Sequence, residues 1–579
     1  MFLQGSILCL DAFTIALQQA CDDRKWEVTS WYTSTKQLQL ASLEFCAACR
    51  SVPTLHVKVE NGTPTRLWMG APDRETRSSK RLNATRVPVI RARKVTWKLS
   101  TSALRRMGDV FSSRVKFFIF DDEFNGDVRG VAWPRELKEL IFGELFNQPI
   151  ADVAWPASLE ELHFFGDFDQ PIGRAQWPPS LRRLWFGECF NQPLNHASWP
   201  QSLQFLTIDD GFNQPIDKIA WPPSLQYLQL GDAFNQPIAA VNWPSSLVTL
   251  QLDGEEFNQA IDMVTWPGSL KEIKFGRAFN HPIGGVRWPA SLQHLTFLSN
   301  LEHLVGDIAW PPSLQKLSLV DMFNQPVNHA SWPPCLQHLS FGVEFNQPIG
   351  GIKWPASLQH MTFMSNFEHL VGDASWPPSL QRLEFGYVFN QSIATIAWPP
   401  SLRILKFGRD FDQPIVAVAW PPSLQQLEFG TSFNQPITDV SWPDSLQELS
   451  FTGDRLRYKN IQMTSLELLR ACGVLSDFNQ PITGVTWPSS LVKLSFGESF
   501  DQPVTGVAWP ASLRELAFGR DFSLPGESFE WPTSLEKLTI ACRLDDPRPS
   551  WPGVRVSRIW PACWDKCVDR VGRGSFGHV

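Results

Sequence analysis

Residues 133–154 read WPRELKELIFGELFNQPIADVA, and the same phrase begins again at Trp155, Trp177, Trp199, Trp221 and Trp243. Its general form is W-P-x-S-L-x-x-L-x-F-G-x-x-F-N-Q-P-I-x-x-V-x, repeated every 22 residues. A fixed step of this length is typical of a stacked-coil protein, because each copy is too short to bury its own apolar face and must lay it on the next copy. The period therefore decides the fold.

The repeat continues through most of the chain, with about 20 units in total. One extra acidic residue, at Glu255 or Glu256, makes a single 23-residue step to Trp266. Between Trp442 and Trp487 one unit is degraded, because Gln462-Met463 replaces its Trp-Pro. The segment 464–466 keeps the Ser-Leu part of the phrase, so we count this stretch as a coil of the stack.

The middle of the phrase predicts one short strand per unit. In L-x-x-L-x-F-G the second Leu and the Phe are two residues apart, which is the period of a strand with one buried face. The Gly stands where we expect the backbone to turn. The predicted fold class is a β-rich solenoid of about 20 coils of 22 residues, with a parallel sheet on one face.

The rest of the phrase returns the chain to the next strand. In F-N-Q-P-I the Phe is expected to fill the core, and Pro, which lacks a backbone donor, fixes the bend. The Asn amide can satisfy backbone groups of a neighbouring coil, which predicts an internal amide ladder. Asp169, Asp412 and Asp501 stand at this position in three units, and we interpret them as substitutes for Asn. The recurring Trp predicts a stacked column of buried indoles.

At these residues the chain resembles the FNIP repeat, a relative of the leucine-rich repeat, over roughly residues 117–541. Members of that family usually carry Leu-Pro where this chain has Trp-Pro, so the core column is expected to be bulkier here. The resemblance implies a leucine-rich-repeat-like solenoid that is used for protein recognition.

We divide the chain into a basic N-terminal cap region at 1–116, the solenoid at 117–552, and a C-terminal cap with a Gly-rich tail at 553–579. Residues 50–116 hold 16 Lys and Arg against four Asp and Glu, although the whole chain has a net charge of −7. We interpret the first region as a small mixed cap, helical over 11–50, that seals the open end of the stack. The alternative is that residues 50–116 bind nucleic acid or an acidic surface.

Composition favours a soluble protein, since 43% of residues are hydrophobic and no stretch approaches the roughly 20 apolar residues that span a bilayer. The ten Cys show no paired spacing that recurs with the repeats, which favours a reducing compartment. Two local pairs, Cys46/Cys49 and Cys563/Cys567, lie at opposite ends of the solenoid, so we expect no metal site. We expect a cytoplasmic or nuclear protein without a membrane segment, and a monomer.

The sequence carries no catalytic signature of the hydrolase, metalloprotease or P-loop types, so we predict a protein that is not an enzyme and needs no cofactor. His294, His338 and His360 share one strand position and are interpreted as surface residues. Residues 572–579, GRGSFGHV, fit the kinase glycine-rich loop, although the Lys and the H-R-D and D-F-G motifs of a kinase are absent. We interpret the segment as a flexible tail, and the alternative is that the chain is the truncated recognition arm of a repeat-kinase fusion.

The candidate binding site follows from the strand pattern. Each strand has two outward positions, before and after its second Leu, and most of these positions are polar. Three neighbouring units depart from this rule by placing Arg183, Trp185, Phe205 and Tyr227 there. Arg, Trp and Tyr are enriched at binding hot spots. We therefore predict that a protein partner docks here, with the aromatic residues as apolar anchors and Arg183 directed at an acidic group.

Overall fold

In the computed structural model the described residues are 115–302, 308–364, 366–452, 476–523, 529 and 531–540, with the backbone of 94–97 and 555–558. The chain forms two compact units, residues 1–278 and 279–579. Every regular element in the described ranges is a β-strand. Within those ranges, no helix has the length and apolar character needed to cross a membrane.

The strands of each unit follow one another at nearly constant spacing. The described strands of the first unit are β1 (Lys94–Trp97), β2 (Phe117–Phe120), β3 (Glu139–Phe142), β4 (Glu161–Phe164), β5 (Arg183–Phe186), β6 (Phe205–Ile208), β7 (Tyr227–Leu230), β8 (Thr249–Leu252) and β9 (Glu272–Phe275). Those of the second unit are β10 (His294–Phe297), β11 (Lys316–Leu319), β12 (His338–Phe341), β13 (His360–Phe363), β14 (Arg382–Glu384), β15 (Ile404–Lys406), β16 (Gln426–Glu428), β17 (Glu448–Ser450), β18 (Lys493–Ser495), β19 (Glu515–Phe518), β20 (Lys537–Ile540) and β21 (Arg555–Arg558).

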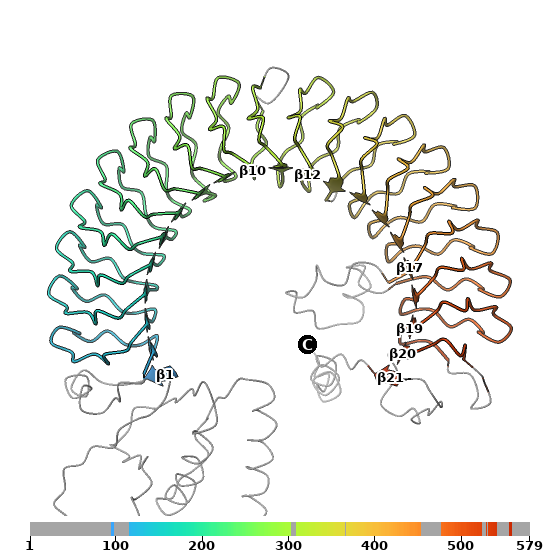
Figure 1. Ribbon diagram of the computed structural model, residues 1–579, viewed down its shortest axis with the longest axis horizontal. Helices are drawn as coiled ribbons and strands as arrows, with labels where there is room; N and C mark the ends of the chain where they lie inside the picture. The colour runs from blue at the N-terminus through green and yellow to red at the C-terminus, as the bar shows by residue number, and fades with distance from the viewer. Residues whose placement is uncertain are drawn as a thin grey trace, which may run out of the picture. The chain divides into compact units, whose positions relative to one another are not determined.

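Within each unit, consecutive strands pair in parallel and in the same register. In the first unit Leu184 lies beside Leu206, which lies beside Leu228. In the second unit Leu405 lies beside Leu427, which lies beside Leu449. Figure 1 shows that the strands of a unit line one side of its coils, and that the return stretches lie on the other side. The predicted parallel-sheet solenoid is confirmed.

The core lies between the strand and the return stretch of each coil. Along most strands the residues alternate between partly exposed and buried, and the buried ones are the second Leu and the Phe of the phrase. The Phe of F-N-Q-P is also buried and stacks on its counterpart in the next coil. For example, the ring centroids of Phe212 and Phe234 are 6.0 Å apart at an interplanar angle of 7°. Stacks of aromatic rings therefore fill much of each unit, and aliphatic side chains such as Leu301 take the ring position in some coils.

The Gly that follows many of the strands allows close packing between coils, and at some positions only Gly fits. At Gly430, an added Cβ would overlap the carbonyl oxygen of Gly408 in the preceding coil. No side chain fits in that space. The sequence predicted this Gly for a turn, whereas its role at this position is to let two backbones approach each other.

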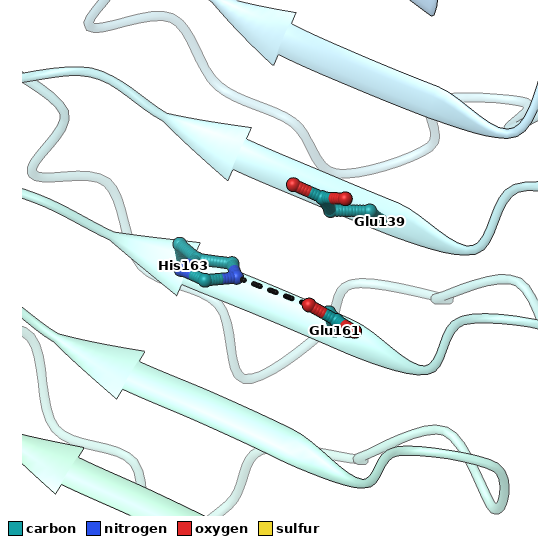
Figure 2. A group of neighbouring side chains, drawn as sticks. All are labelled: Glu139, Glu161 and His163. Carbon is teal, nitrogen blue, oxygen red and sulfur yellow. Dashed lines mark ion pairs between the residues drawn. The ribbon is translucent and has the colours of Figure 1, made fainter. Parts of the chain in front are cut away.

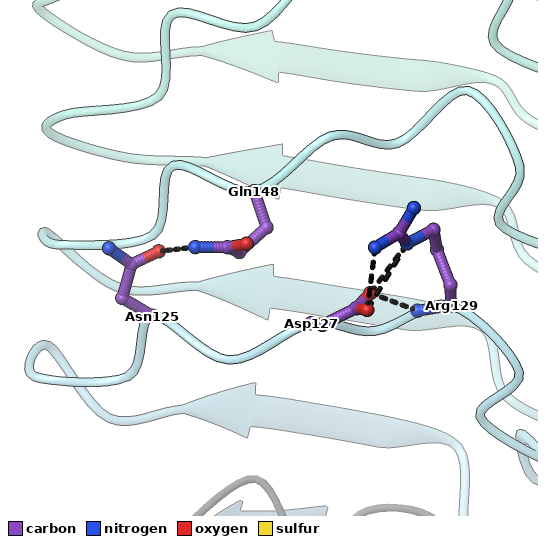
Figure 3. A network of polar contacts seen from close by, with 4 residues as sticks. All are labelled: Asn125, Asp127, Arg129 and Gln148. Atoms are coloured by element: carbon purple, nitrogen blue, oxygen red, sulfur yellow. Dashed lines mark hydrogen bonds and ion pairs between the residues drawn. The ribbon is translucent and has the colours of Figure 1, made fainter.

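The amide ladder is present as predicted. The side-chain oxygen of each ladder residue accepts hydrogen bonds from the next coil, as in Figure 3, where the Asn125 Oδ1 accepts one from the Gln148 Nε2 at 2.9 Å. The same Oδ1 accepts a second bond from the backbone N–H of Asn147 at 3.0 Å. In one of the units with an acidic residue, the Asp169 Oδ1 accepts from the Asn191 N–H and the Gln192 Nε2, both at 2.9 Å. The interpretation of the Asp residues as substitutes for Asn is thus confirmed there.

A second ladder, which the sequence analysis missed, is made by the Ser of P-x-S-L. Its hydroxyl donates to the carbonyl oxygen of the first Leu in the preceding coil, for example from the Ser158 Oγ to the Leu137 O at 2.7 Å and from the Ser445 Oγ to the Leu424 O at the same distance. Each such coil is therefore tied to its neighbour by the strand, the amide ladder and the Ser ladder.

The Trp column is also confirmed. The indoles are buried or half-buried, and neighbours stack, as between Trp221 and Trp243, whose ring centroids are 6.4 Å apart at 13°. Several indoles also meet a core ring edge-on, as Trp155 meets Phe142 at 6.2 Å and 73°. The indoles and the Phe stacks therefore form one continuous apolar interior within each unit.

The stack of about 20 predicted coils continues across the degraded unit between Trp442 and Trp487. There β17 pairs directly with β18, with Leu449 beside Leu494. The amide ladder crosses the same joint, since the Asn479 N–H donates to the Asn434 Oδ1 at 3.0 Å although the two residues are 45 positions apart.

The predicted region boundaries remain predictions, because most of 1–116 and 553–579 lies outside the described residues. Two strands from these regions do join the sheets: β1 pairs in parallel with β2, and β21 pairs in parallel with β20. The predicted helix at 11–50 also lies outside the described residues.

Candidate functional site

The four predicted binding residues lie together on the outward face of β5, β6 and β7. We call Arg183, Trp185, Phe205 and Tyr227 the aromatic patch. Strand register places Arg183 beside Phe205 and Phe205 beside Tyr227. The Arg183 side chain is 48% exposed, and the three aromatic side chains are half-buried. The alternation of the strands therefore presents all four side chains on the same face.

The residues of the patch contact one another. The Arg183 guanidinium carbon lies 4.9 Å from the centroid of the Phe205 ring, within the range of a cation–π contact. The rings of Phe205 and Tyr227 are 5.9 Å apart at a tilt of 35°. Arg183 also forms an ion pair with Glu161 on β4, at 3.5 Å from the Nη1 to the Oε1. The patch is thus a preassembled surface whose cation already has an intramolecular partner.

Tyr227 lies at one end of the patch and contacts two Gln side chains. Its hydroxyl lies 2.8 Å from both the Gln229 Oε1 and the Gln251 Oε1. Burial, with the carboxylates of Asp253 and Glu272 nearby, raises the pKa of Tyr227 to about 12. The hydroxyl therefore keeps its proton at neutral pH and remains a donor.

A second group of functional side chains adjoins the patch on β3 and β4. Glu139, Glu161 and His163 each offer a ligand atom, and these three atoms all lie within 4.8 Å of one another. Figure 2 shows the three side chains on one face of the two strands, with the imidazole directed toward Glu161. The His163 Nε2 is 3.9 Å from the Glu161 Oε2. We call these three residues the Glu-His cluster.

His163 is buried although the strand pattern directs it outward. Its imidazole stacks on the Trp185 indole, with centroids 5.1 Å apart at 17°, and Ile141 on β3 is its other neighbour in register. Only 9% of the residue is exposed. Burial, and to a lesser degree the Arg183 cation, lower the pKa of His163 to about 4. The ring is therefore neutral at neutral pH.

An acidic group borders the patch where β6 ends. Asp209 follows Ile208 directly, and its carboxyl is partly buried among other acids. Burial raises the pKa of Asp209 to about 6, and the carboxylates of Asp210, Glu188 and Asp232 act in the same direction. The charged form is thus disfavoured in the folded protein.

This shift predicts a pH-dependent stability. An acid whose pKa is raised on folding stabilises the fold most below its unfolded pKa of 3.8, and this contribution is lost as the pH rises through about 6. We expect Asp209→Asn to stabilise the protein at pH 7.5 by about 1–2 kcal/mol, which allows for the partial exposure of the carboxyl. The gain should disappear near pH 4. Denaturant midpoints of the parent and the variant at both pH values measure it.

The matched control for this prediction is Asp217→Asn, which removes an exposed carboxylate from the return stretch of the same coil. It should change the midpoint little at either pH. An Asp209→Asn effect that is equal at pH 4 and pH 7.5 would show that burial of the charge is not its cause.

The histidines of the second unit form a separate basic column. Strand register places Lys316 between His294 and His338, and His360 beside His338. The rings of His338 and His360 are 4.3 Å apart and nearly perpendicular. Burial lowers the pKa of both imidazoles, and nearby cations act in the same direction. No third ligand of the His, Cys, Asp or Glu type joins them within the described residues.

The other sequence candidates lie elsewhere. The basic segment 50–116 is outside the described residues except for its last two residues and the backbone of β1, and the pairs Cys46/Cys49 and Cys563/Cys567 and the Gly-rich segment 572–579 are wholly outside them. The Glu-His cluster was missed at the sequence level, because its members look like ordinary polar residues at outward positions. The signal that could have found it is the aromatic Trp185 one strand away, which covers His163.

Comparison with protein families gives one match. The model of the FNIP Repeat matches this chain ten times. The matched ranges are 146–189, 168–211, 190–231, 212–255, 257–300, 323–366, 372–410, 396–430, 411–454 and 478–521. No curated protein matches the chain.

Two solved structures that are similar to this chain differ in how closely they match it. CroV588, described as a novel circular LRR protein, is 28% identical and has a TM-score of 0.51, with 78% of this chain and 81% of that chain covered. An internalin from Listeria monocytogenes is 14% identical with a TM-score of 0.34, covering 53% of this chain and 84% of that chain. The first likeness agrees with the leucine-rich-repeat-like fold described above.

Proposed function

This chain belongs to the FNIP-repeat family, and we propose from that premise that it is a non-catalytic scaffold that binds a protein partner over the aromatic patch. Repeat solenoids of the leucine-rich-repeat type present long exposed sheets that commonly serve protein interaction. The observation that carries the proposal is the clustering of three large aromatic side chains and an Arg at outward positions of three adjacent strands.

The chemistry of the patch suggests what a partner presents to it. Trp185, Phe205 and Tyr227 offer ring faces for apolar side chains, and such residues carry most of the energy at hot spots. The planar guanidinium group of Arg183 can donate two parallel hydrogen bonds to a carboxylate. Since Arg183 already pairs with Glu161, an acidic side chain of the partner has to share or replace that ion pair. We therefore expect a modest contribution from Arg183 and a larger one from the rings.

The test is a triple change of Trp185, Phe205 and Tyr227 to Ser in the full chain. Binding proteins are first captured from native lysate and identified, and the affinity of each purified candidate for parent and variant is then measured. We expect the variant to bind the true partner at least about 2 kcal/mol more weakly, which is about 30-fold in Kd. Because the rings also pair across strands, their removal should lower stability by about 0.2–1 kcal/mol per pair.

The matched control changes Ile404, Gln426 and Glu448 to Ser. These residues lie side by side on three adjacent strands of the second unit, at the strand position that Phe205 and Tyr227 occupy in the first unit. The control should bind as the parent does. If the two triple variants bind equally well while both remain folded, the patch is not the docking site.

A further inference from the structure

Beyond the docking function, we propose that Glu139, Glu161 and His163 form a binding site for a divalent transition-metal ion, for which zinc is the best match. The inference rests on the Glu-His cluster and does not depend on any protein partner.

The first observation is an imidazole nitrogen that lacks a hydrogen-bond partner. The His163 Nε2 is buried and has no such partner among the described residues, and only 9% of the residue is exposed to solvent. Buried polar atoms of this kind are rare in most folded proteins. The described residues of this chain hold others, chiefly indole nitrogens of the Trp column, and the His163 Nε2 differs from those because an imidazole nitrogen can bind a metal ion. The nearest carboxylate oxygen, the Glu161 Oε2, is 3.9 Å away, which is too long for a hydrogen bond.

The second observation is the direction of the three ligand groups. Glu139 and Glu161 lie side by side in register on β3 and β4, and His163 lies two residues further along β4 on the same face. Their ligand atoms lie within 4.8 Å of one another. Ligand atoms bound to zinc at about 2.1 Å are about 3.4 Å apart in a tetrahedron, so small rotations of the two partly exposed Glu side chains close the site.

The third observation is that the groups around the cluster already orient it. Stacking on Trp185 fixes the plane of the His163 ring. Arg183 contacts the Oε1 of Glu161, whereas the oxygen that faces His163 is the Oε2, so the ion pair leaves one carboxylate oxygen for the metal. Such outer contacts, which hold a ligand in its binding orientation, are typical of protein metal sites.

The donor set selects the kind of ion. Calcium and magnesium prefer oxygen ligands alone, whereas imidazole suits zinc and its neighbours in the first transition row. Three protein ligands of the His and carboxylate type, on a face open to solvent, correspond to a zinc site with a fourth position available to water or to another molecule. No reaction is inferred from this arrangement.

The experiment titrates zinc into the metal-stripped full chain in competition with a chromophoric chelator. The chain has ten Cys and 11 His, so zinc binding elsewhere is expected as a background, and the comparison between variants isolates the site. We expect His163→Gln to weaken zinc binding at one site by at least about 100-fold. Loss of a residue that only supports a metal ligand costs up to about 100-fold, and loss of a ligand itself should cost at least as much. Glu139→Gln combined with Glu161→Gln should do the same while keeping the His163–Trp185 stack.

The matched control is the double variant His338→Gln, His360→Gln, which removes two adjacent imidazoles that have no third ligand among the described residues. It should bind zinc at the Glu-His cluster as the parent does. Zinc titrations that are the same for parent and His163→Gln, or a loss confined to the control, would overturn the proposal. Thermal melts of each variant without metal establish that the chain is folded.

Cobalt provides a second readout, because it reports the ligands of its site in its spectrum. We expect visible cobalt bands that His163→Gln removes and that carry no thiolate-to-cobalt charge transfer, since the cluster contains no Cys. Thiolate bands that are the same in parent and variant are the background from the cysteines. If the spectra of parent and His163→Gln do not differ in any cobalt band, the proposal is wrong.

Discussion

Replacing Trp354 by Ala is expected to lower the free energy of unfolding by about 3–5 kcal/mol, because the change removes a large buried ring from the core. Trp354 is 9% exposed. Its ring centroid lies 5.4 Å from that of Trp332 and 6.3 Å from that of Phe341. Truncation removes these contacts and leaves a cavity between two coils that are held apart by their own backbones.

The destabilisation should come from packing alone. The Trp354 Nε1 has no hydrogen-bond partner within the described residues, so no polar contact is broken with the ring. In a stacked array each coil is stabilised mainly by its neighbours, and the damage should therefore spread to adjacent coils. Hydrogen exchange at β12, β13 and β14, together with the denaturant midpoint, measures both the size and the spread of the effect.

Two variants control this prediction. Trp354→Phe keeps most of the buried ring and should cost less than about 1.5 kcal/mol. Met322→Ala removes an exposed apolar side chain of the same unit, 51% exposed, and should change stability by no more than about 0.5 kcal/mol. A Trp354→Ala protein that melts with the parent would mean that the indole column contributes nothing to the stack.

The second large effect is expected at the amide ladder. The Asn213 Oδ1 accepts hydrogen bonds from the Asn235 N–H at 3.0 Å and from the Gln236 Nε2 at 2.9 Å. Asn213→Ala leaves the Asn235 N–H without this acceptor, whereas the Gln236 Nε2 keeps its bond to the Asn213 backbone oxygen at 3.1 Å. A buried unsatisfied group costs about 1–3 kcal/mol, and because this donor is only partly buried, we expect a loss of about 2 kcal/mol in the free energy of unfolding, measured as a shift in the denaturant midpoint.

The chain itself supplies the control for the ladder. Asp412 occupies the same place in another coil, and its Oδ1 accepts from the Asn434 N–H and the Gln435 Nε2, both at 2.9 Å. Asn213→Asp keeps an acceptor at the position and should cost less than about 1 kcal/mol. Asn195→Ala, at an exposed position of the preceding return stretch, should be nearly neutral. If Asn213→Asp and Asn213→Ala unfold at the same denaturant concentration, the acceptor oxygen is not what the ladder needs.

Most of the fold follows from the sequence because each coil repeats the same local solution. The spacing of the second Leu and the Phe predicted the strands, and the recurring Asn predicted the ladder, because each feature depends only on the same feature in the neighbouring coil. The Gln side chain as a second donor to the ladder was not predicted. The reason for Gly430 was not predictable in the same way. It depends on how close the Gly408 carbonyl approaches, and that distance is a property of two coils together.

The candidate site was predictable only in part. The outward placement of Trp185, Phe205 and Tyr227 follows from strand alternation. The burial of His163 does not, because it results from a ring that arrives from the next coil and lies flat on the imidazole. The ion pair between Arg183 and Glu161 is likewise a contact between coils. The sequence pattern of one unit predicts the face of the sheet on which a side chain lies. The exposed fraction of that side chain depends on the residues of the neighbouring unit.

The direct pairing of β17 with β18 has a consequence for how such a gene changes over generations. Chain length between these two strands is 45 residues from Leu449 to Leu494, yet their register is the same as in an ordinary pair such as β15 and β16. Whole repeat units can therefore be gained, lost or degraded during evolution. The flanking coils still pair with each other, whatever the number of residues that connects them. The same joint is a natural place to splice a tag or a foreign domain into the protein.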